Sequence, residues 1–188
     1  MAGRIFVTSD THFGHDREFL YKPRGFNSIE EHDEAIIERW NSVVDKDDDV
    51  YLLGDLTLGD KEYGKSCIAR LNGYIHVILG NHDSAAREQM YVEDLDNIVE
   101  VNYATIIKYK KYHFYLSHYP SMTANFDSNS LHNCLINLYG HTHQKTNFYN
   151  EMPFIYHVGM DSHNCTPVLL DDAIKDMKVK VEECKTFL

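Results

Sequence analysis

Short apolar runs separated by polar segments recur along the chain, and their lengths are typical of buried β-strands. The apolar positions between residues 99 and 117 indicate a β-hairpin, with residues 109–112 at or near its turn. We expect further strands at residues 4–8, 50–53, 74–79, 135–139 and 154–158. Strands are therefore the main elements that the pattern predicts.

Helical signals stand between these strands. Ser28 and Glu31 match a capping box, in which each side chain satisfies a free backbone donor of the first helical turn. With the apolar stripe that follows, they predict a helix over residues 28–44. A second helix is expected at residues 61–71, closed by an Asn-Gly pair, and a short third one from a cap at Asp171 through residue 177.

The order of the elements indicates the fold class. Helices alternate with the early strands, whereas the later strands follow one another, and this mixture is typical of stacked sheets rather than of one doubly wound sheet. We therefore expect an α/β (α+β) fold with two stacked mixed β-sheets flanked by helices. A length of 188 residues without a linker, repeat or low-complexity tract predicts a single domain over residues 1–188.

Composition and charge exclude several classes of function. Hydrophobic residues make up 43% of the chain and charged residues 25%, as in ordinary globular proteins. A net charge of −11 is unsuited to long nucleic acid, because phosphate backbones need a basic footprint. No stretch approaches the roughly 20 apolar residues that cross a bilayer, and Asp10 comes too early for a signal peptide. We expect no membrane partner and a cytoplasmic location, and the oligomeric state stays open.

The histidine content prompts a search for metal ligands. The chain has 12 histidines and 4 cysteines, and the cysteines lie far apart, without the paired spacing of a metal or redox motif. Buried or free thiols are expected in a cytoplasmic chain. Candidate ligands are therefore sought among oxygen and nitrogen side chains.

Such side chains directly follow apolar runs along the chain. They are Asp10 and His12, Asp55, Asn81 with His82, His118, and His141 with His143. Because strand ends in a sheet converge on one crevice, we expect these side chains to lie together. Carboxylate, carboxamide and imidazole groups suit Mn²⁺, Fe or Zn²⁺. Leaving His82 aside, seven ligands are too many for one tetrahedral ion, and with one shared carboxylate they are sufficient for two.

The same motifs, in this order, resemble those of the calcineurin-like metallophosphoesterases. The motifs are Asp10-x-His12, Gly54-Asp55, Gly80-Asn81-His82-Asp83, His118 and Gly140-His141-x-His143. The resemblance spans about residues 4–161. It is greatest to the compact bacterial and phage members, whose first motif often reads as Ser9 to His15 does here. The resemblance implies a four-layer αββα fold and hydrolysis of a phosphate ester.

The resemblance also implies a role for each motif residue. One metal site would consist of Asp10, His12, Asp55 and His143, and a second would share Asp55 and add Asn81, His118 and His141. Two divalent ions are implied, with Mn²⁺ favoured and Fe, Zn²⁺ or Ni²⁺ as alternatives, and a metal-bridging hydroxide as the nucleophile. His82 matches the histidine that faces the scissile phosphate, where it can bind that group or protonate the leaving oxygen.

Two features bear on the substrate class: where the sequence departs from the family's motifs, and which charged residues lie near those motifs. No Asp-Arg pair follows Gly54-Asp55, unlike in the protein Ser/Thr phosphatases, so phosphoprotein is not the expected substrate. This departure leaves the orienting partner of His82 open, with Asp83 as a candidate. Arg24 is expected to bind a phosphate oxygen, and His15 to contact substrate or to orient a ligand.

Few cations accompany these motifs, so a small phosphodiester, which carries one negative charge, is favoured over a monoester, which carries two near neutral pH. The alternatives are a phosphomonoesterase acting on a nucleotide or sugar phosphate, and a non-catalytic binding scaffold, since some relatives keep the fold and lose catalysis. Asp161 and His163 resemble a tail motif of the compact members whose role stays open.

Overall fold

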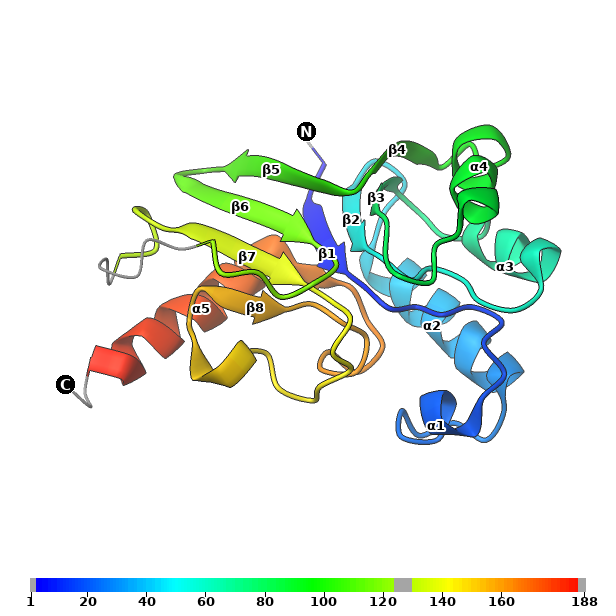
Figure 1. The fold of residues 1–188 in the computed structure, drawn as a ribbon, viewed down its shortest axis with the longest axis horizontal. Coiled ribbons are helices and arrows are strands. Elements are labelled where there is room, and N and C mark those ends of the chain that lie inside the picture. The colour runs from blue at the N-terminus through cyan, green and yellow to red at the C-terminus, as the bar shows by residue number, and fades with distance from the viewer. Residues whose placement is uncertain (1–2, 124–129, 186–188) are drawn as a thin grey trace.

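The computed structural model describes residues 3–123 and 130–185, whose strands form two stacked sheets (Figure 1). The strands of the first sheet are β1 (Ile5–Thr8), β2 (Asp49–Leu53), β3 (Tyr74–Ile78), β4 (Ile98–Asn102) and β9 (Val168–Leu169). Their order is β4-β3-β2-β1-β9. The first four run parallel and β9 is antiparallel to β1, so the sheet is mixed.

The second sheet has the order β5-β6-β7-β8. Its strands are β5 (Ala104–Tyr109), β6 (Tyr112–Ser117), β7 (Leu135–Tyr139) and β8 (Ile155–His157). β5 and β6 form an antiparallel hairpin, and β6, β7 and β8 run parallel. The predicted class, two stacked mixed sheets flanked by helices, is therefore confirmed. Of the range 1–188 predicted as one domain, residues 1–2, 124–129 and 186–188 lie outside the described part.

Three of the five α-helices of the described chain lie on the face of the first sheet that points away from the second sheet. The helices are α1 (Glu18–Tyr21), α2 (Ile29–Val43), α3 (Lys61–Ile68), α4 (Ala85–Glu93) and α5 (Leu170–Lys185), with a 3-10 turn at Tyr149–Glu151. Figure 1 shows α2, α3 and α4 on that outer side. In contrast, α5 places its apolar face in the core that the two sheets share. Within the described ranges, no helix has the length and apolar character that crossing a bilayer requires.

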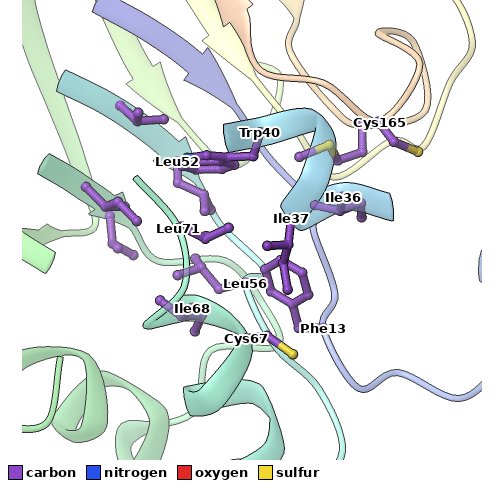
Figure 2. Packing of buried hydrophobic residues seen from close by; sticks show 14 of the residues in the cluster. Phe13, Ile36, Ile37, Trp40, Leu52, Leu56, Cys67, Ile68, Leu71 and Cys165 are labelled. Carbon is purple, nitrogen blue, oxygen red and sulfur yellow. The ribbon is translucent and has the colours of Figure 1, made fainter. Parts of the chain in front are cut away.

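The central strands are buried on both faces, which explains their continuous apolar runs. Neighbouring residues of one strand enter different cores: Leu52 packs toward α2 and α3, and Leu53 packs toward the second sheet. Trp40 of α2 is fully buried near Leu52 (Figure 2), and its indole N–H donates to the Asn72 carbonyl at 2.9 Å. The expected cap of α2 is present, because Ser28 Oγ accepts from the Glu31 backbone N–H.

Several predicted boundaries are wrong. The segment predicted as one hairpin at 99–117 is split, because β4 joins the first sheet beside β3 and the chain crosses at Tyr103 into the second sheet. Only β5 and β6 form the hairpin, with Lys110 and Lys111 at its turn. The helix predicted through residue 71 ends at Ile68, and the helix predicted to end at residue 177 continues to residue 185. The short elements α1, α4 and β9 were not predicted.

Candidate metal centre and active-site pocket

The structure brings all seven predicted ligand residues to one edge of the molecule, where parallel strands of both sheets end. Loops after β1, β2 and β3 carry Asp10, His12, Asp55 and Asn81. Loops after β6 and β7 carry His118, His141 and His143. Carboxyl ends of parallel strands form the usual crevice of an open sheet, and here two stacked sheets share it.

The ligand loops turn sharply as they leave the strands. Five of the seven ligand residues have left-handed backbones, namely Asp10 (φ 59°), His12 (51°), Asp55 (57°), His141 (68°) and His143 (48°). Such a conformation costs a non-glycine residue on the order of 1–3 kcal/mol, and strain of this kind gathers at functional sites. The surrounding fold therefore stabilises a loop geometry that these residues would not adopt alone.

Two motif glycines allow the loops to approach one another. Gly54 has φ 92°, and a Cβ atom there would collide with the ring of His118. A Cβ atom at Gly80 would collide with the Asp55 carboxylate. The glycines that precede Asp55 and Asn81 are thus required by close packing between ligand loops.

The first donor group surrounds a carboxylate oxygen of Asp10. The Nε2 atoms of His12 and His143 lie 3.3 Å apart, and each is within 3.9 Å of Asp10 Oδ1. The other oxygen, Asp10 Oδ2, accepts from the His141 backbone N–H at 2.9 Å. Asp10 Oδ1 is buried and has no hydrogen-bond partner among the described residues. One oxygen is thus fixed by the backbone, and the other faces the two imidazoles.

The second donor group is built in the same way around Asp55. Its Oδ1 accepts from the His82 backbone N–H at 2.9 Å. Its Oδ2 lies 3.5 Å from His118 Nε2 and 3.8 Å from His12 Nε2, between the two groups. Asn81 Oδ1 is 2.9 Å from both His118 Nε2 and His141 Nδ1. Asp55 Oδ2 therefore lies between the two groups, and Asp10 also has ligand atoms close to both, to His12 and His143 and to Asp55 and His118.

This donor set fits two divalent cations. Each group gathers oxygen and imidazole nitrogen atoms, which is the mixture that Mn²⁺, Fe and Zn²⁺ accept. Asp10 Oδ1 is buried without a hydrogen-bond partner among the described residues, as expected of an oxygen that could bind a cation. His118 Nδ1 lies 2.8 Å from the Leu53 carbonyl, a contact that assigns the proton to Nδ1 and leaves the Nε2 lone pair free.

Burial controls the protonation of several ligands. Burial, reinforced by the nearby His143, lowers the pKa of His12 well below the ordinary value, so the imidazole is neutral at pH 7. Burial and the neighbouring His118 also lower the pKa of His141. Burial raises the pKa of Asp55, although His118 opposes the shift. Neutral imidazoles are the form that binds metals.

A cavity of about 380 Å³ opens beside the two donor groups. Its walls are His12, His15, Phe19, Leu20, Asp55, Leu58, Asn81, His82, His141 and His143. The polar lining is thus made of predicted site residues, and Phe19, Leu20 and Leu58 form the apolar part of the lining. Phe19 is 72% exposed, an unusual state for a large aromatic side chain. No lysine or arginine of the described chain is among the lining residues.

His82 and His15 lie at this cavity, as expected for groups that meet a substrate. The His82 ring lies 5.6 Å from the His12 ring and is exposed, and no side chain of the described residues hydrogen-bonds to it. The His15 ring lies 5.4 Å from the His12 ring. Asp83 does not orient His82, because its carboxylate accepts from the Asp55 and Gly80 backbones and from the Tyr91 hydroxyl.

Arg24 does not lie where it could bind a substrate phosphate in the cavity. Its side chain is only 1% exposed and does not line the cavity. The guanidinium donates to both carboxylate oxygens of Asp161 at 3.0 and 2.7 Å and to the Asp10 carbonyl at 3.0 Å. A side chain held in this way cannot also bind a phosphate oxygen in the cavity.

Sequence reasoning missed two sets of residues near the site. The first is the apolar wall of Phe19, Leu20 and Leu58, for which the sequence held no signal. The second is His32 and Asp33, both fully buried in α2. They follow Ile29 by three and four positions, on the apolar stripe of the helix, and two polar residues on a buried stripe are a signal of internal hydrogen bonding.

Comparison with known proteins agrees with the motifs. The family described as "Calcineurin-like phosphoesterase superfamily domain" matches residues 4–160. The uncharacterized protein MJ1445 of Methanocaldococcus jannaschii is 35% identical over 182 residues, which is 92% of this chain and 90% of that protein. The Gene 66 protein of Mycobacterium phage L5 is 41% identical over 82 residues, 42% of this chain and 39% of that protein. The crystal structure of the protein of unknown function AQ665 from Aquifex aeolicus has the same fold, with a TM-score of 0.67 and 22% identity over 92% of this chain and 98% of that one.

Proposed function

Because the chain belongs to the calcineurin-like phosphoesterase superfamily, we propose that it is a dinuclear-metal hydrolase of small phosphate esters with a preference for phosphodiesters. The observation that carries this proposal is the pair of donor groups that share Asp55 Oδ2 at the edge of a cavity. Asp10, His12, Asp55 and His143 would hold one ion, and Asp55, Asn81, His118 and His141 would hold the other. Two divalent ions, Mn²⁺ by preference, would neutralise phosphate charge and activate a water molecule for attack.

The chain's own residues supply the remaining chemistry. Cleavage of an ester bond leaves an alkoxide or aryloxide that needs a proton, and an imidazole beside the bond can donate one. His82 is exposed to the cavity and is not committed to another side chain, so it is available to bind the phosphate and to protonate the leaving oxygen. His15, on the same wall, would contact a phosphate oxygen or the leaving group.

The lining of the cavity supports a diester. A phosphomonoester carries two negative charges near neutral pH, and enzymes for such dianions profit from an exposed guanidinium or ammonium. The described lining residues include none, and Arg24 is committed to Asp161. A diester carries one charge and two organic groups, and the wall of Phe19, Leu20 and Leu58 offers an apolar surface for one of them.

A comparison of two model substrates tests the proposal. The Mn²⁺-loaded protein should cleave bis(p-nitrophenyl) phosphate with a higher kcat/KM than p-nitrophenyl phosphate at neutral pH, and chelation should abolish both activities. Asp10→Asn serves as the inactive control. A preference for the monoester would reassign the substrate class. Protein that binds two ions and cleaves neither ester would overturn the proposal and favour the binding scaffold.

A further inference from the structure

Behind the first donor group, a buried ion pair contacts the ligand His143. His143 Nδ1 lies 2.8 Å from Asp161 Oδ2, and Arg24 makes the bidentate contact with the same carboxylate. The side chains of Arg24 and Asp161 are 1% and 9% exposed. Arg24, expected from the sequence to bind substrate, is therefore engaged on the far side of a ligand from the cavity.

The same guanidinium reaches a second ligand and a helix. Its Nη2 donates to the Asp10 carbonyl at 3.0 Å and also lies 3.4 Å from His143 Nδ1, farther than the 2.8 Å of Asp161 Oδ2. Arg24 therefore contacts two ligand residues of one donor group, and the shorter contact of His143 Nδ1 is the one with Asp161. Its Nη1 lies 2.9 Å from His32 Nε2 in α2. The chain of contacts links the first donor group to the helix that packs on the first sheet.

The next contacts return from the helix to the ligand loop. His32 Nδ1 lies 2.7 Å from Asp33 Oδ1, and Asp33 Oδ2 accepts from the Gly14 backbone N–H at 2.8 Å. Gly14 lies between His12 and His15. A continuous network thus begins at the partly exposed His143, passes through the buried side chains of Arg24, Asp161, His32 and Asp33, and ends at the loop that carries His12.

His143 is the ligand that needs such support. The side chains of His12 and His118 are 2% and 1% exposed and are fixed by packing, whereas that of His143 is 38% exposed. A buried ion pair is by itself weak evidence for a contribution to stability, because desolvating two charges costs much of what their attraction returns. The Arg24–Asp161 pair contacts His143, the more exposed of the two imidazoles in the first donor group. Its position therefore indicates that the pair orients the His143 ring.

We propose that Asp161, held in place by Arg24, is a positioning residue that fixes the tautomer and the rotamer of His143. With the Nδ1 proton donated to Asp161, the Nε2 lone pair is directed toward His12 and Asp10, where the first ion would bind. Carboxylate partners of metal-bound histidines have this effect in general. The role of this pair rests on the proposed function, in that the first donor group is taken to hold a metal.

The test measures Mn²⁺ binding by calorimetry in variants of the pair. Wild-type protein should bind two ions, and Asp161→Asn should weaken one of them by roughly 10–100-fold and leave the other unchanged. Asp48→Asn is the matched control. Asp48 is buried and pairs at 2.6 Å with the half-exposed Arg4, near the start of β1 and away from the site, so its loss should lower stability without changing either affinity.

A second variant separates positioning from folding. Asp161→Asn leaves the Arg24 charge buried without its partner, whereas Arg24→Met combined with Asp161→Leu replaces the pair by apolar groups and should restore stability. The double variant should still bind two ions, one with the wild-type affinity and the other with the weakened affinity of Asp161→Asn. In metal-free protein, long-range ¹H–¹⁵N spectra should show His143 as the Nδ1–H tautomer in wild type and as a mixture in the double variant.

The outcomes are distinguishable. Wild-type affinity for both ions in the double variant, or an unchanged His143 tautomer, would overturn the role of Asp161. Wild-type protein that binds no Mn²⁺ would overturn the proposed function instead, and the tautomer measured without metal would then decide the role of Asp161.

Discussion

The Nε2 atoms of His12 and His143 face each other at 3.3 Å, although the two residues are 131 positions apart in the chain. At this distance the two nitrogens either share a proton or, when both are unprotonated, repel, and a cation beside both relieves that repulsion. Asp10 Oδ1, within 3.9 Å of each, has no other partner among the described residues. The fold thus holds three ligand atoms in an arrangement that a divalent ion would stabilise.

Asp55→Asn should weaken both metal sites, because Asp55 Oδ2 faces His12 in one group and His118 in the other. His143→Ala should mainly empty one site, since His143 belongs to the first group alone. Elemental analysis after gel filtration, with wild type carrying two ions per chain, provides the measurement. One ion or none in active wild-type protein would contradict the dinuclear assignment.

His82→Gln should retain both ions and lose turnover by roughly 10²–10⁴-fold, the usual effect of a positioned acid or base. The side chain is exposed to the cavity and only its backbone contacts Asp55, so the substitution leaves the donor groups intact. Steady-state kinetics with bis(p-nitrophenyl) phosphate and a parallel metal analysis are required. Turnover close to wild type would show that His82 does not act on the leaving group.

Phe19→Ala should raise KM for an aryl diester by roughly 3–10-fold and change kcat less, because an aromatic contact contributes about 0.5–1.5 kcal/mol. Phe19 lines the cavity, and its ring lies 5.6 Å from the His15 ring. Tyr103→Ala is the matched control, since this side chain is 76% exposed but does not line the cavity. Equal KM values in the two variants would remove Phe19 from the substrate surface.

Acid should destabilise the metal-free protein as the pH falls from about 6.5 toward 4. Burial holds the pKa of His157 at about 4 in the folded chain, against an ordinary 6.5, so the unfolded chain binds the proton first. The contribution of His157 to the free energy of unfolding is fully present above pH 6.5. It is lost as the pH falls toward 4, and the total loss is about 3 kcal/mol. In urea unfolding at several pH values, the free energy of unfolding should fall less between pH 6.5 and pH 4 in His157→Gln than in the control His113→Gln. Identical slopes would contradict this assignment.

The convergence of the ligand residues was predictable because each follows an apolar run, and the carboxyl ends of parallel strands share an edge. The split between β4 and β5 was not predictable. The apolar positions continue on both sides of Tyr103, and the only turn-favouring residue between Ile98 and Tyr109 is Asn102, which alone does not mark a change of sheet. The pattern shows which residues are buried, and pairing decides which sheet they join.

Arg24 shows a second limit of the sequence. A basic residue in a loop next to a phosphate-binding motif favours a clamp, and only the fold reveals that Asp161, 137 positions away, neutralises it. The length of α5 was underestimated for a related reason. Met177 and Val181 are buried against residues of the second sheet, and that tertiary contact extends the helix beyond its first turns.

The two sheets contribute to each donor group, and this has a mechanical consequence. His12 and Asp55 come from the first sheet, whereas His118 and His143 come from the second. Ions bound at the shared edge would cross-link the sheets much as a disulfide joins two segments of chain. Resistance of the sandwich to shear, and to proteases that require its edge to open, would then depend on the supply of metal.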